Sequence, residues 1–488
     1  MRENHLTKLK EFRGLTPFSF QQDAYVDCMN FLTDGRKSSG LAILPTAWGK
    51  SLLISWLSLS LFDSGEKVLM VVPSIELLKQ NLSKLQSYTT VDVGVYSGSM
   101  GQKDLDKPLV IATVNSLKEH SKDFKGFKYV IVDEAHYKFP SKKNSNSDDG
   151  VFKSFIKKLK PLKILGLTAT PFSLGQNKGF NVLNMLTNES YPIFKEIVHV
   201  TQIKQVIEEG RWSNIKYENY PYKKEGLVLN STGNDFTEES IALVNKANNV
   251  NNSAYMLAKS LDENSKCLMF VDSLVTADIM REHLQKKLSR RVEVVSSKTK
   301  DSERAEIVDV FISTKEIACI VNVGIFTTGF DCPDLTHIIM ARPTNSLALY
   351  YQIIGRGVRV FEGKDFFTYI DLCGNIDRFG KVEDITIEKF RHYGWNVFYN
   401  DRLITTAPLN YKITKSDLIN RKYVSFPSSK MEMEFGKYIG SPVNKLPKFY
   451  RDFLITSLQT EKFLDKKRED LLNLLLKMNE YEINQLFI

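Results

Sequence analysis

The sequence predicts an α/β protein with two tandem domains, each built on a doubly wound parallel sheet, and a small, mainly helical C-terminal region. Continuous apolar runs such as 68–72 and 129–132 are typical of strands buried on both faces of a parallel sheet. These runs alternate with segments of helical periodicity, which favours right-handed crossover connections. A chain of 488 residues also exceeds what one core accommodates. We expect domains at residues 1–200, 201–385 and 386–488.

The composition is that of an ordinary globular protein, with 42% hydrophobic and 25% charged residues. No apolar run approaches the ~18 residues of a membrane helix, and no apolar signal region follows the N-terminus. We therefore expect a cytoplasmic protein, associated with the nucleoid or, if phage-encoded, located in the host cytoplasm. The five cysteines are scattered, which predicts buried free thiols. A net charge of +9 favours a polyanionic partner without identifying it.

Residues 43–51, Ile-Leu-Pro-Thr-Ala-Trp-Gly-Lys-Ser, connect an expected strand to an expected helix. Backbone N–H groups at such a helix start face a phosphate, Lys50 neutralises its charge, and the Ser51 hydroxyl can hold Mg²⁺. The strict phosphate-loop pattern has Gly at position 44, where this chain has Leu44. Taken alone, the stretch therefore leaves open a strand–turn–helix unit in which Gly-Lys-Ser occurs by chance.

Small and hydroxyl residues follow three of the apolar runs in the first domain. Pro73 and Ser74 end one run, and Gly98 and Thr113 end the next two. Ligands of doubly wound sheets bind at the carboxyl ends of strands, where small side chains let a phosphate chain come close. Gln21 lies on the first expected helix, and its amide can both donate to and accept from a purine edge. An ordinary capped helix is the alternative for that segment.

The apolar run 129–132 delivers two adjacent carboxylates, Asp133 and Glu134, to a strand end. In nucleotide hydrolysis such a pair has two tasks: Asp133 would hold Mg²⁺ through its water shell, and Glu134 would polarise the attacking water. Asp-Glu pairs also occur at strand ends without this function. We expect this strand to neighbour the strand before Lys50, and the two motifs together are stronger than either alone.

The order of these segments resembles the first motor domain of superfamily 2 helicases of the DEAH type. The resemblance implies RecA-like domains, with ATP and Mg²⁺ as cofactors and a second motor domain downstream. It rests on Gln21, Gly49-Lys50-Ser51, Val72-Pro73-Ser74, Asp133-Glu134-Ala135-His136 and Thr168-Ala169-Thr170.

A second set of segments follows, and the resemblance covers roughly residues 12–380. We interpret the Asn-rich segment 230–252 as the connection between the two domains. Residues 266–273 match motif IV, residues 327–331 resemble motif V, and residues 351–359 resemble motif VI. The run Gly374-Asn375-Ile376-Asp377-Arg378-Phe379-Gly380 is similar to the RadD-like branch.

Motif VI has a physical logic of its own. Gln352, Arg356 and Arg359 recur at spacings of four and three, so we expect them on one helix face. Two guanidiniums on one face repel each other unless they meet an anion, and a triphosphate held by the opposite domain is such an anion. Arginines of this kind accelerate phosphoryl transfer by ~10³–10⁵ in related nucleotide hydrolases. A solvated basic helix face is the alternative.

The resemblance implies a role for each matching residue. That family usually has Ala or Gly at 44 and Gly at 47, so we expect Leu44 to point into the sheet and Ala47 to need a modest backbone adjustment. The implied catalytic residues are Lys50, Asp133, Glu134, Gln352, Arg356 and Arg359. The implied ATP-binding residues are Gln21, Thr46, Ala47, Trp48, Gly49, Lys50, Ser51, Gly329 and Asp331, with Ser51 and Asp133 on the metal. Coupling is assigned to His136, Thr168 and Thr170, and nucleic-acid binding to Pro73, Ser74, Gly98, Thr113, Ser273 and Thr328.

These motifs look more like UvsW-like phage, RadD-like and XPB-like DNA helicases than like the RNA-specific DEAD type. We therefore expect an ATP-dependent DNA helicase or translocase that remodels branched or forked DNA in replication, recombination or repair. Its expected partners are single-stranded and branched or forked duplex DNA and other recombination or replication proteins. An RNA helicase, the motor subunit of a restriction-type complex and a non-hydrolysing DNA-binding protein are the alternatives.

The C-terminal region lies outside the resemblance. Basic residues outnumber acidic ones in 411–451, and aromatic residues are interleaved with them. This pattern suits a nucleic-acid groove, but a small helical domain with a basic surface explains it equally well. Leucines at helical spacing in 464–486 predict a terminal amphipathic helix.

Overall fold

The computed structural model describes most of the chain in two compact units. One unit comprises Met1–Phe172 and Leu186–Thr386, and the other comprises Ser173–Met185 and Ile387–Ile488. The predicted motif V residues Thr328, Gly329 and Asp331 lie outside the described part. The described residues are 16–118, 120–137, 150–177, 180–188, 192–230, 233, 235–324, 332–390, 394–405, 413–416, 431–461 and 464–484.

The first unit contains two sheets, and we call the halves built on them lobe 1 and lobe 2. The sheet of lobe 1 has the order β10-β1-β7-β6-β2-β5-β3-β4. Its strands are parallel except for β4, which pairs antiparallel with β3. The strands are β1 (Ser38–Ile43), β2 (Val68–Val72), β3 (Val93–Ser97), β4 (Gln102–Lys103), β5 (Leu109–Thr113), β6 (Tyr129–Val132), β7 (Lys163–Thr168) and β10 (Glu196–Val200).

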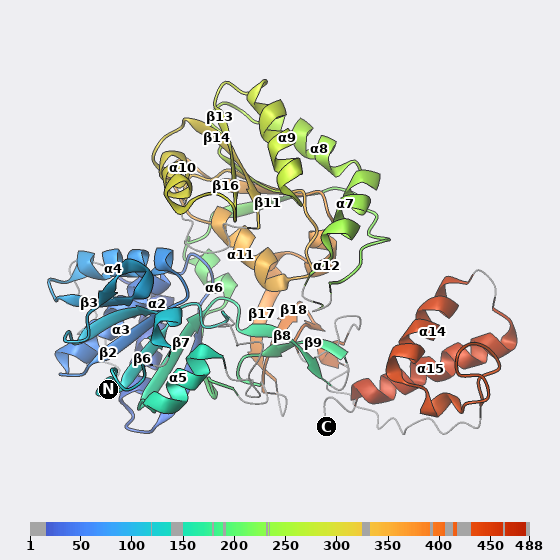
Figure 1. Cartoon of the computed structure of the whole chain (residues 1–488), viewed down its shortest axis with the longest axis horizontal. Coiled ribbons are helices and arrows are strands. Elements are labelled where there is room, and N and C mark those ends of the chain that lie inside the picture. Colours follow the sequence, from blue (N-terminus) through green and yellow to red (C-terminus); the bar gives the residue numbers. More distant parts are fainter. Residues whose placement is uncertain are drawn as a thin grey trace. The chain divides into compact units, whose positions relative to one another are not determined.

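The apolar runs of lobe 1 form strands buried on both faces, as predicted, because helices cover the sheet (Figure 1). Helix α3 is itself buried from Leu53 to Leu61. The expected adjacency of the strands before Lys50 and Asp133 is wrong, since β7 lies between β1 and β6. All three strands are parallel, so their carboxyl ends still share one edge. The helices are α2 (Ser19–Thr33), α3 (Lys50–Asp63), α4 (Ile75–Tyr88), α5 (Val151–Leu159), η1 (Gly98–Met100) and η2 (Val114–Leu117).

The sheet of lobe 2 is entirely parallel, with the order β11-β16-β15-β12-β14-β13. Its strands are β11 (Asn214–Asn219), β12 (Cys267–Phe270), β13 (Arg291–Ser296), β14 (Ile317–Val323), β15 (His337–Met340) and β16 (Phe366–Asp371). Its helices are α7 (Glu238–Ala247), α8 (Val250–Lys259), α9 (Leu274–Gln285), α10 (Asp301–Ser313), α11 (Leu347–Gly357), α12 (Asn375–Phe379) and η3 (Val382–Asp384).

The chain passes from one sheet to the other over residues 201–213, which include α6 (Ile203–Glu208). The interpretation of the Asn-rich segment 230–252 as the inter-domain connection is therefore wrong. Thr237 caps α7 by accepting a hydrogen bond from the Ser240 N–H, so this polar segment starts helices of lobe 2.

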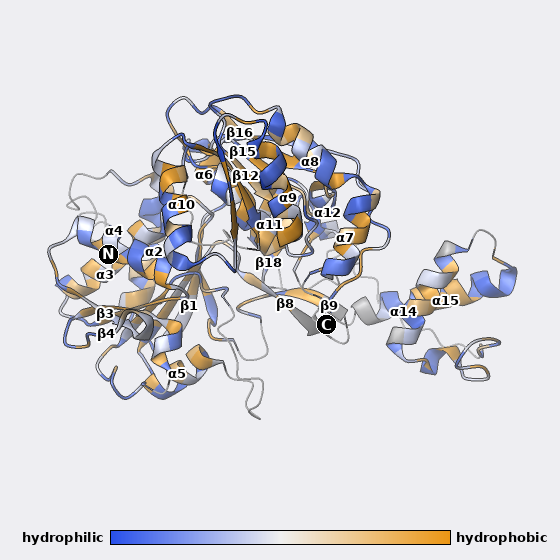
Figure 2. Ribbon diagram, turned by 45° about the horizontal axis from the view of Figure 1, so that its top comes forward, coloured by the Kyte–Doolittle hydropathy of each residue, from blue (hydrophilic) through white to orange (hydrophobic). Residues whose placement is uncertain are grey.

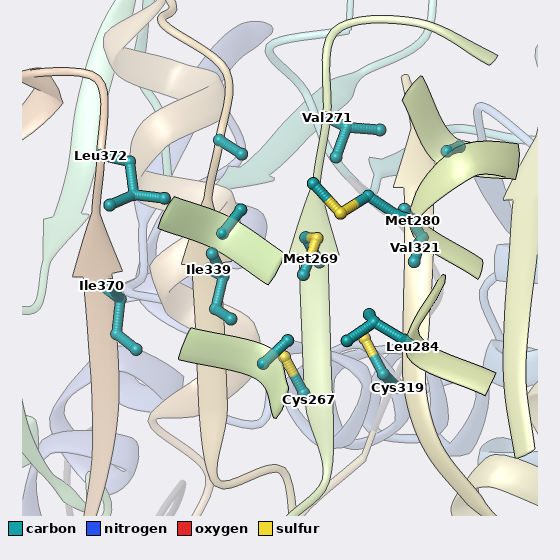
Figure 3. Close-up of a cluster of buried hydrophobic side chains, with 14 of the residues drawn as sticks. Cys267, Met269, Val271, Met280, Leu284, Cys319, Val321, Ile339, Ile370 and Leu372 are labelled. Atoms are coloured by element: carbon teal, nitrogen blue, oxygen red, sulfur yellow. The ribbon is translucent and has the colours of Figure 1, made fainter. Parts of the chain in front are cut away.

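The core of lobe 2 lies between its sheet and helices α8 and α9. Met269 of β12 and Val321 of β14 pack with Met280 and Leu284 of α9 (Figure 3). The cysteines of the chain are all buried free thiols, as expected. The strands consist mostly of hydrophobic residues, and the helices carry hydrophilic residues on their outer sides (Figure 2).

The second unit combines two short sheets with a helical pair. Leu454 and Leu458 of α14 pack with Leu471 and Leu475 of α15, so the predicted terminal amphipathic helix is present. None of the helices in the described residues is both long and apolar enough to span a membrane. The elements are β8 (Phe172–Asn177), β9 (Phe180–Met185), β17 (Ile385–Lys389), β18 (Trp395–Tyr399), β19 (Arg402–Leu403), η5 (Val443–Lys445), α14 (Lys448–Thr460) and α15 (Lys466–Asn484).

Candidate nucleotide-binding site

The loop between β1 and α3 has the backbone of an anion cradle. Gly49 is the N-cap of α3 with φ +95°, so Lys50 and Ser51 open the helix. Leu44 is fully buried, as expected. Ala47 has φ +58°, which is the left-handed region that disfavours side chains. This departure is larger than the modest adjustment we expected.

Gln21 of α2 braces this loop. Its side-chain oxygen accepts a hydrogen bond from the Phe18 N–H at 3.1 Å, and its Nε2 donates to the Trp48 carbonyl at 2.9 Å. The Trp48 indole N–H donates in turn to Thr201 Oγ1 at 3.0 Å, and both Gln21 and Trp48 are buried. The loop is thus tied to α2 and to the chain after β10. Contact between Gln21 and a purine stays a prediction.

The two carboxylates at the end of β6 have different environments. Lys50 Nζ donates to Glu134 Oε1 at 2.6 Å, and both side chains are largely buried. Asp133 accepts hydrogen bonds from the Glu134 N–H and from Asn81 Nδ2, each at 2.9 Å. Glu134 has φ +47°, a strained value of the kind that clusters at functional sites.

The electrostatics separate the two acids further. Burial raises the pKa of Asp133, and the neighbouring charge of Glu134 raises this pKa further. Burial also opposes ionisation of Glu134, but the positive charge of Lys50 and, less strongly, that of Arg356 hold its pKa below the usual range. Glu134 is therefore the acid that stays ionised, as a group that polarises water must.

His136 connects the two lobes through a chain of hydrogen bonds. Its Nε2 lies 2.8 Å from Gln352 Nε2, and its Nδ1 lies 2.8 Å from Thr168 Oγ1. The amide nitrogen can only donate, so the arrangement requires a neutral imidazole with its proton on Nδ1. Burial lowers the pKa of His136, which agrees with a neutral ring. The Thr170 N–H also donates to Thr168 Oγ1, so the three predicted coupling residues meet.

The expectation that Gln352, Arg356 and Arg359 share one helix face is wrong for Arg359. Helix α11 ends at Gly357, and Arg359 pairs with Trp212 as an antiparallel bridge. At this helix end Lys364 Nζ donates to the Gly357 carbonyl and the Ser213 N–H donates to the Val358 carbonyl, so both groups have partners outside the helix.

The segment 209–213 connects several parts of the site, and no motif in the sequence predicts this role. Glu209 accepts hydrogen bonds from the Ser19 backbone and hydroxyl at the start of α2. The Trp212 indole N–H donates to the Thr46 carbonyl of the phosphate loop at 2.9 Å. The Ser213 hydroxyl donates to the Arg359 carbonyl at 2.7 Å. The sequence feature that could have indicated this segment is Trp212, a large aromatic residue within an otherwise mostly polar connection.

Arg211 lies in the same segment, with its guanidinium 4.9 Å from the centre of the Phe18 ring. Burial and the charge of Arg359 lower the pKa of Arg211. Gly355 of α11 also approaches the phosphate loop, because a Cβ at this position would lie 2.5 Å from Thr46 Oγ1. Only a glycine allows this close contact between α11 and the loop.

The predicted nucleic-acid-binding residues that the structure describes, which are all of them except Thr328, lie at the expected strand ends. Ser74 and Ser273 are the N-caps of α4 and α9, and each accepts a hydrogen bond from the backbone three residues later. Ser116 connects Thr113 and Gly98, since its hydroxyl contacts Thr113 Oγ1 and accepts a hydrogen bond from the Gly98 N–H. Pro73 is buried at the end of β2. Their contact with nucleic acid stays a prediction.

The residues around Asp133 fit a magnesium ion. Mg²⁺ prefers hard oxygen ligands, uses one or two carboxylates, and keeps several waters or substrate phosphates. Asp133 supplies the carboxylate, and Ser51 supplies a hydroxyl at the start of α3. Asn81 Oδ1 is buried beside Asp133 without a hydrogen-bond partner among the described atoms, so it can accept from a metal-bound water.

Two families match this chain in tandem. Residues 14–173 match the family described as type III restriction enzyme, res subunit, and residues 249–361 match the helicase conserved C-terminal domain. The first match contains Lys50 and Glu134 of lobe 1, and the second contains Gln352 of lobe 2.

Curated relatives and solved structures agree with these matches. The Saccharomyces cerevisiae protein IRC3, named as an ATP-dependent helicase, is 27% identical over 73% of this chain, and the chain spans about half, 51%, of its length. The ATP-dependent DNA helicase UvsW of phage T4 is 24% identical over 75% of this chain and 71% of its own. An HsdR fragment of a type I restriction enzyme from Vibrio vulnificus has the same fold, with a TM-score of 0.57, 19% identity, and coverage of 77% of this chain and 67% of that one.

Proposed function

Since the chain belongs to the superfamily 2 helicases, we propose that it is an ATP-dependent DNA helicase or translocase, which couples ATP hydrolysis to movement along DNA. The observation that carries this proposal is the convergence of both lobes on Glu134. Lys50 reaches Glu134 from the phosphate loop, and Gln352 reaches the adjacent His136 from α11.

ATP binding begins with an exchange of partners. Lys50 lies on Glu134, and the triphosphate carries more negative charge than one carboxylate, so the ammonium group moves onto the phosphates. Backbone N–H groups at the start of α3 hold the same phosphates. Asp133 and Ser51 would hold Mg²⁺, which neutralises phosphate charge when bound. The exchange releases Glu134 to orient the attacking water.

The second lobe completes the catalytic set. The positive charge of Arg356 helps to lower the pKa of Glu134, and we assign its guanidinium to the terminal phosphate of ATP. Arg359 is held by Ser213 and Trp212, and we assign it to the same phosphates. Both arginines would stabilise charge that spreads over the transferring phosphoryl group.

Coupling runs from this site toward the strand ends. Gln352, His136 and Thr168 form a continuous chain of hydrogen bonds, and loss of the terminal phosphate would shift α11 relative to it. Ser74, Thr113 and Ser273 lie at carboxyl ends of strands, where they would contact one DNA strand through its phosphates. Contacts of this kind carry no base information, so movement is independent of sequence.

The proposed substrate is branched or forked DNA, as in replication, recombination or repair. The name of the phage T4 relative, an ATP-dependent DNA helicase, supports DNA over RNA. The experiment is ATPase stimulation by single-stranded, duplex, forked and four-way DNA, with matched RNA. Stimulation that is strongest with forked or four-way DNA supports the proposal, and stimulation by RNA alone favours an RNA helicase.

A second candidate function is the motor subunit of a restriction-type complex. The match of residues 14–173 to a restriction res subunit and the shared fold of the HsdR fragment favour it. Translocation on unbranched duplex DNA, measured by displacement of a triplex-forming strand, would distinguish a restriction-type motor from an enzyme that acts only at branches.

A further inference from the structure

Helix α4 places a polar side chain against the metal-binding carboxylate. Asn81 lies in the middle of α4, is 3% exposed, and donates from Nδ2 to Asp133 Oδ2 at 2.9 Å. Its buried neighbours on this helix, Leu77, Leu78 and Leu85, are apolar. Asn is a weak helix former, and a buried amide costs free energy unless it is hydrogen-bonded. Packing alone would favour another leucine at this position.

Only the nitrogen of the Asn81 side-chain amide has a hydrogen-bond partner among the described atoms. Its Oδ1 is buried and has no hydrogen-bond partner among the described atoms. A buried acceptor without a donor destabilises the folded protein, so such an atom calls for an explanation. A molecule bound beside Asp133 can supply the missing donor, because Asn81 contacts this carboxylate directly.

The carboxylate of Asp133 is fixed from both sides. The Glu134 N–H binds its Oδ1, and Asn81 binds its Oδ2. These two bonds set the rotation of the carboxylate, as the hydrogen-bond partners of metal ligands generally do. Of the two, only the Asn81 bond comes from a side chain, so only it can be removed by substitution.

We propose that Asn81 is a positioning residue for Mg²⁺. Its N–H group orients Asp133, and its carbonyl oxygen accepts a hydrogen bond from a water in the hydration shell of the ion. Mg²⁺ keeps several waters when it binds to proteins, and each bound water presents protons that need acceptors. The inference rests on the proposed function, because it requires Asp133 to act as the ligand of Mg²⁺.

The test measures binding without turnover. A fluorescent, non-hydrolysable ATP analogue is titrated at a series of Mg²⁺ concentrations and in EDTA, using the full chain and its Asn81→Leu and Asn81→Ala variants. Asn81→Leu keeps the size of the side chain and removes both polar atoms, and Asn81→Ala serves if the leucine variant does not fold. Leu85→Ala on the same helix is the matched control for packing alone.

We expect the Asn81 variants to need about 10- to 100-fold more Mg²⁺ for half-maximal tightening of the analogue, with unchanged affinity in EDTA. Leu85→Ala should leave the Mg²⁺ requirement unchanged. The inference is overturned if Asn81→Leu has the wild-type Mg²⁺ midpoint, or if it loses affinity equally with and without Mg²⁺. A wild-type protein that binds the analogue without any effect of Mg²⁺ would instead contradict the proposed function.

Discussion

Gln352 of α11 and His136 beyond β6 belong to different lobes, and their Nε2 atoms lie 2.8 Å apart. The amide donates to a neutral imidazole whose other nitrogen lies 2.8 Å from Thr168 Oγ1. One side chain of lobe 2 therefore contacts the segment that carries Glu134, so the position of α11 is linked to that of the predicted catalytic carboxylate.

Removing this link should separate ATP binding from DNA stimulation. We expect Gln352→Ala to keep the affinity for ATP while the stimulation of ATPase by DNA falls about tenfold or more, within the range of typical coupling free energies. Steady-state ATPase with and without single-stranded DNA measures the effect. Gln285→Ala, an amide in α9 that contacts the Arg290 carbonyl, is the matched control. Unchanged stimulation in Gln352→Ala would remove the coupling role.

Glu134→Gln should abolish ATP turnover and leave folding intact. The amide keeps the shape of the side chain but cannot accept a proton, and a positioned general base contributes about 10²–10⁴ in rate. Single-turnover hydrolysis measures the loss, and thermal unfolding checks the fold. Lys50→Ala should also stop turnover, but through lost phosphate binding, so its affinity for ATP should fall. Wild-type hydrolysis by Glu134→Gln would disprove the assignment of the base.

The pH dependence of activity should have an acidic limb that depends on His136. Burial lowers the pKa of His136 from the ordinary 6.5, so its contribution to stability is complete above that value and is lost as the pH falls below it. Protonation at Nε2 also removes the acceptor for Gln352. The pKa of Glu134 is lowered as well, so Glu134 stays ionised over this range.

The comparison of ATPase pH profiles for wild type and His136→Gln measures this effect. We expect a lower maximal rate in the variant and a flatter profile below about pH 6.5, since the titrating group is absent. An acidic limb that survives unchanged in His136→Gln would assign the titration to another group, of which Asp133, with its raised pKa, is the first candidate.

Trp212→Phe should weaken ATP hydrolysis without touching any predicted catalytic residue. The substitution removes the indole N–H that donates to the Thr46 carbonyl, and a typical intramolecular hydrogen bond contributes about 0.5–1.5 kcal/mol. We expect a lower ATPase rate with only a small change in unfolding temperature. Trp395→Phe in the second unit controls for the same chemical change. Equal rates for wild type and Trp212→Phe would show that the 209–213 segment is a passive connection.

The basic C-terminal region should contribute to DNA affinity through phosphate contacts. Lys437 and Lys445 are exposed in the described part of the second unit. We expect the Lys437→Ala, Lys445→Ala double variant to bind single-stranded DNA more weakly, with a shallower salt dependence by about 0.7 per lost contact. Its basal ATPase should be unchanged. The same double change at Lys259 and Lys287, exposed on lobe 2, is the control, and an identical salt slope in both would refute a C-terminal groove.

Much of the fold was predictable because strands of a doubly wound sheet are buried on both faces, and continuous apolar runs mark such strands. Their order in the sheet was not, since a run of Val and Ile carries no information about its neighbour. For this reason the position of β7 between β1 and β6 was not predicted. The Asn-rich segment was likewise mistaken for the connection, because polar composition marks both linkers and capped helix starts.

The sequence by itself predicted the two parallel-sheet lobes, the position of Lys50 at a helix start and the positions of Asp133 and Glu134 at a strand end, because local patterning marks such positions. Only the tertiary structure decided the end of α11 before Arg359, the contact of Asn81 with Asp133, and the bond from Trp212 to the phosphate loop. The contacts of Asn81 and Trp212 each join segments far apart in the chain through one side chain, and no periodicity or spacing rule records such a contact.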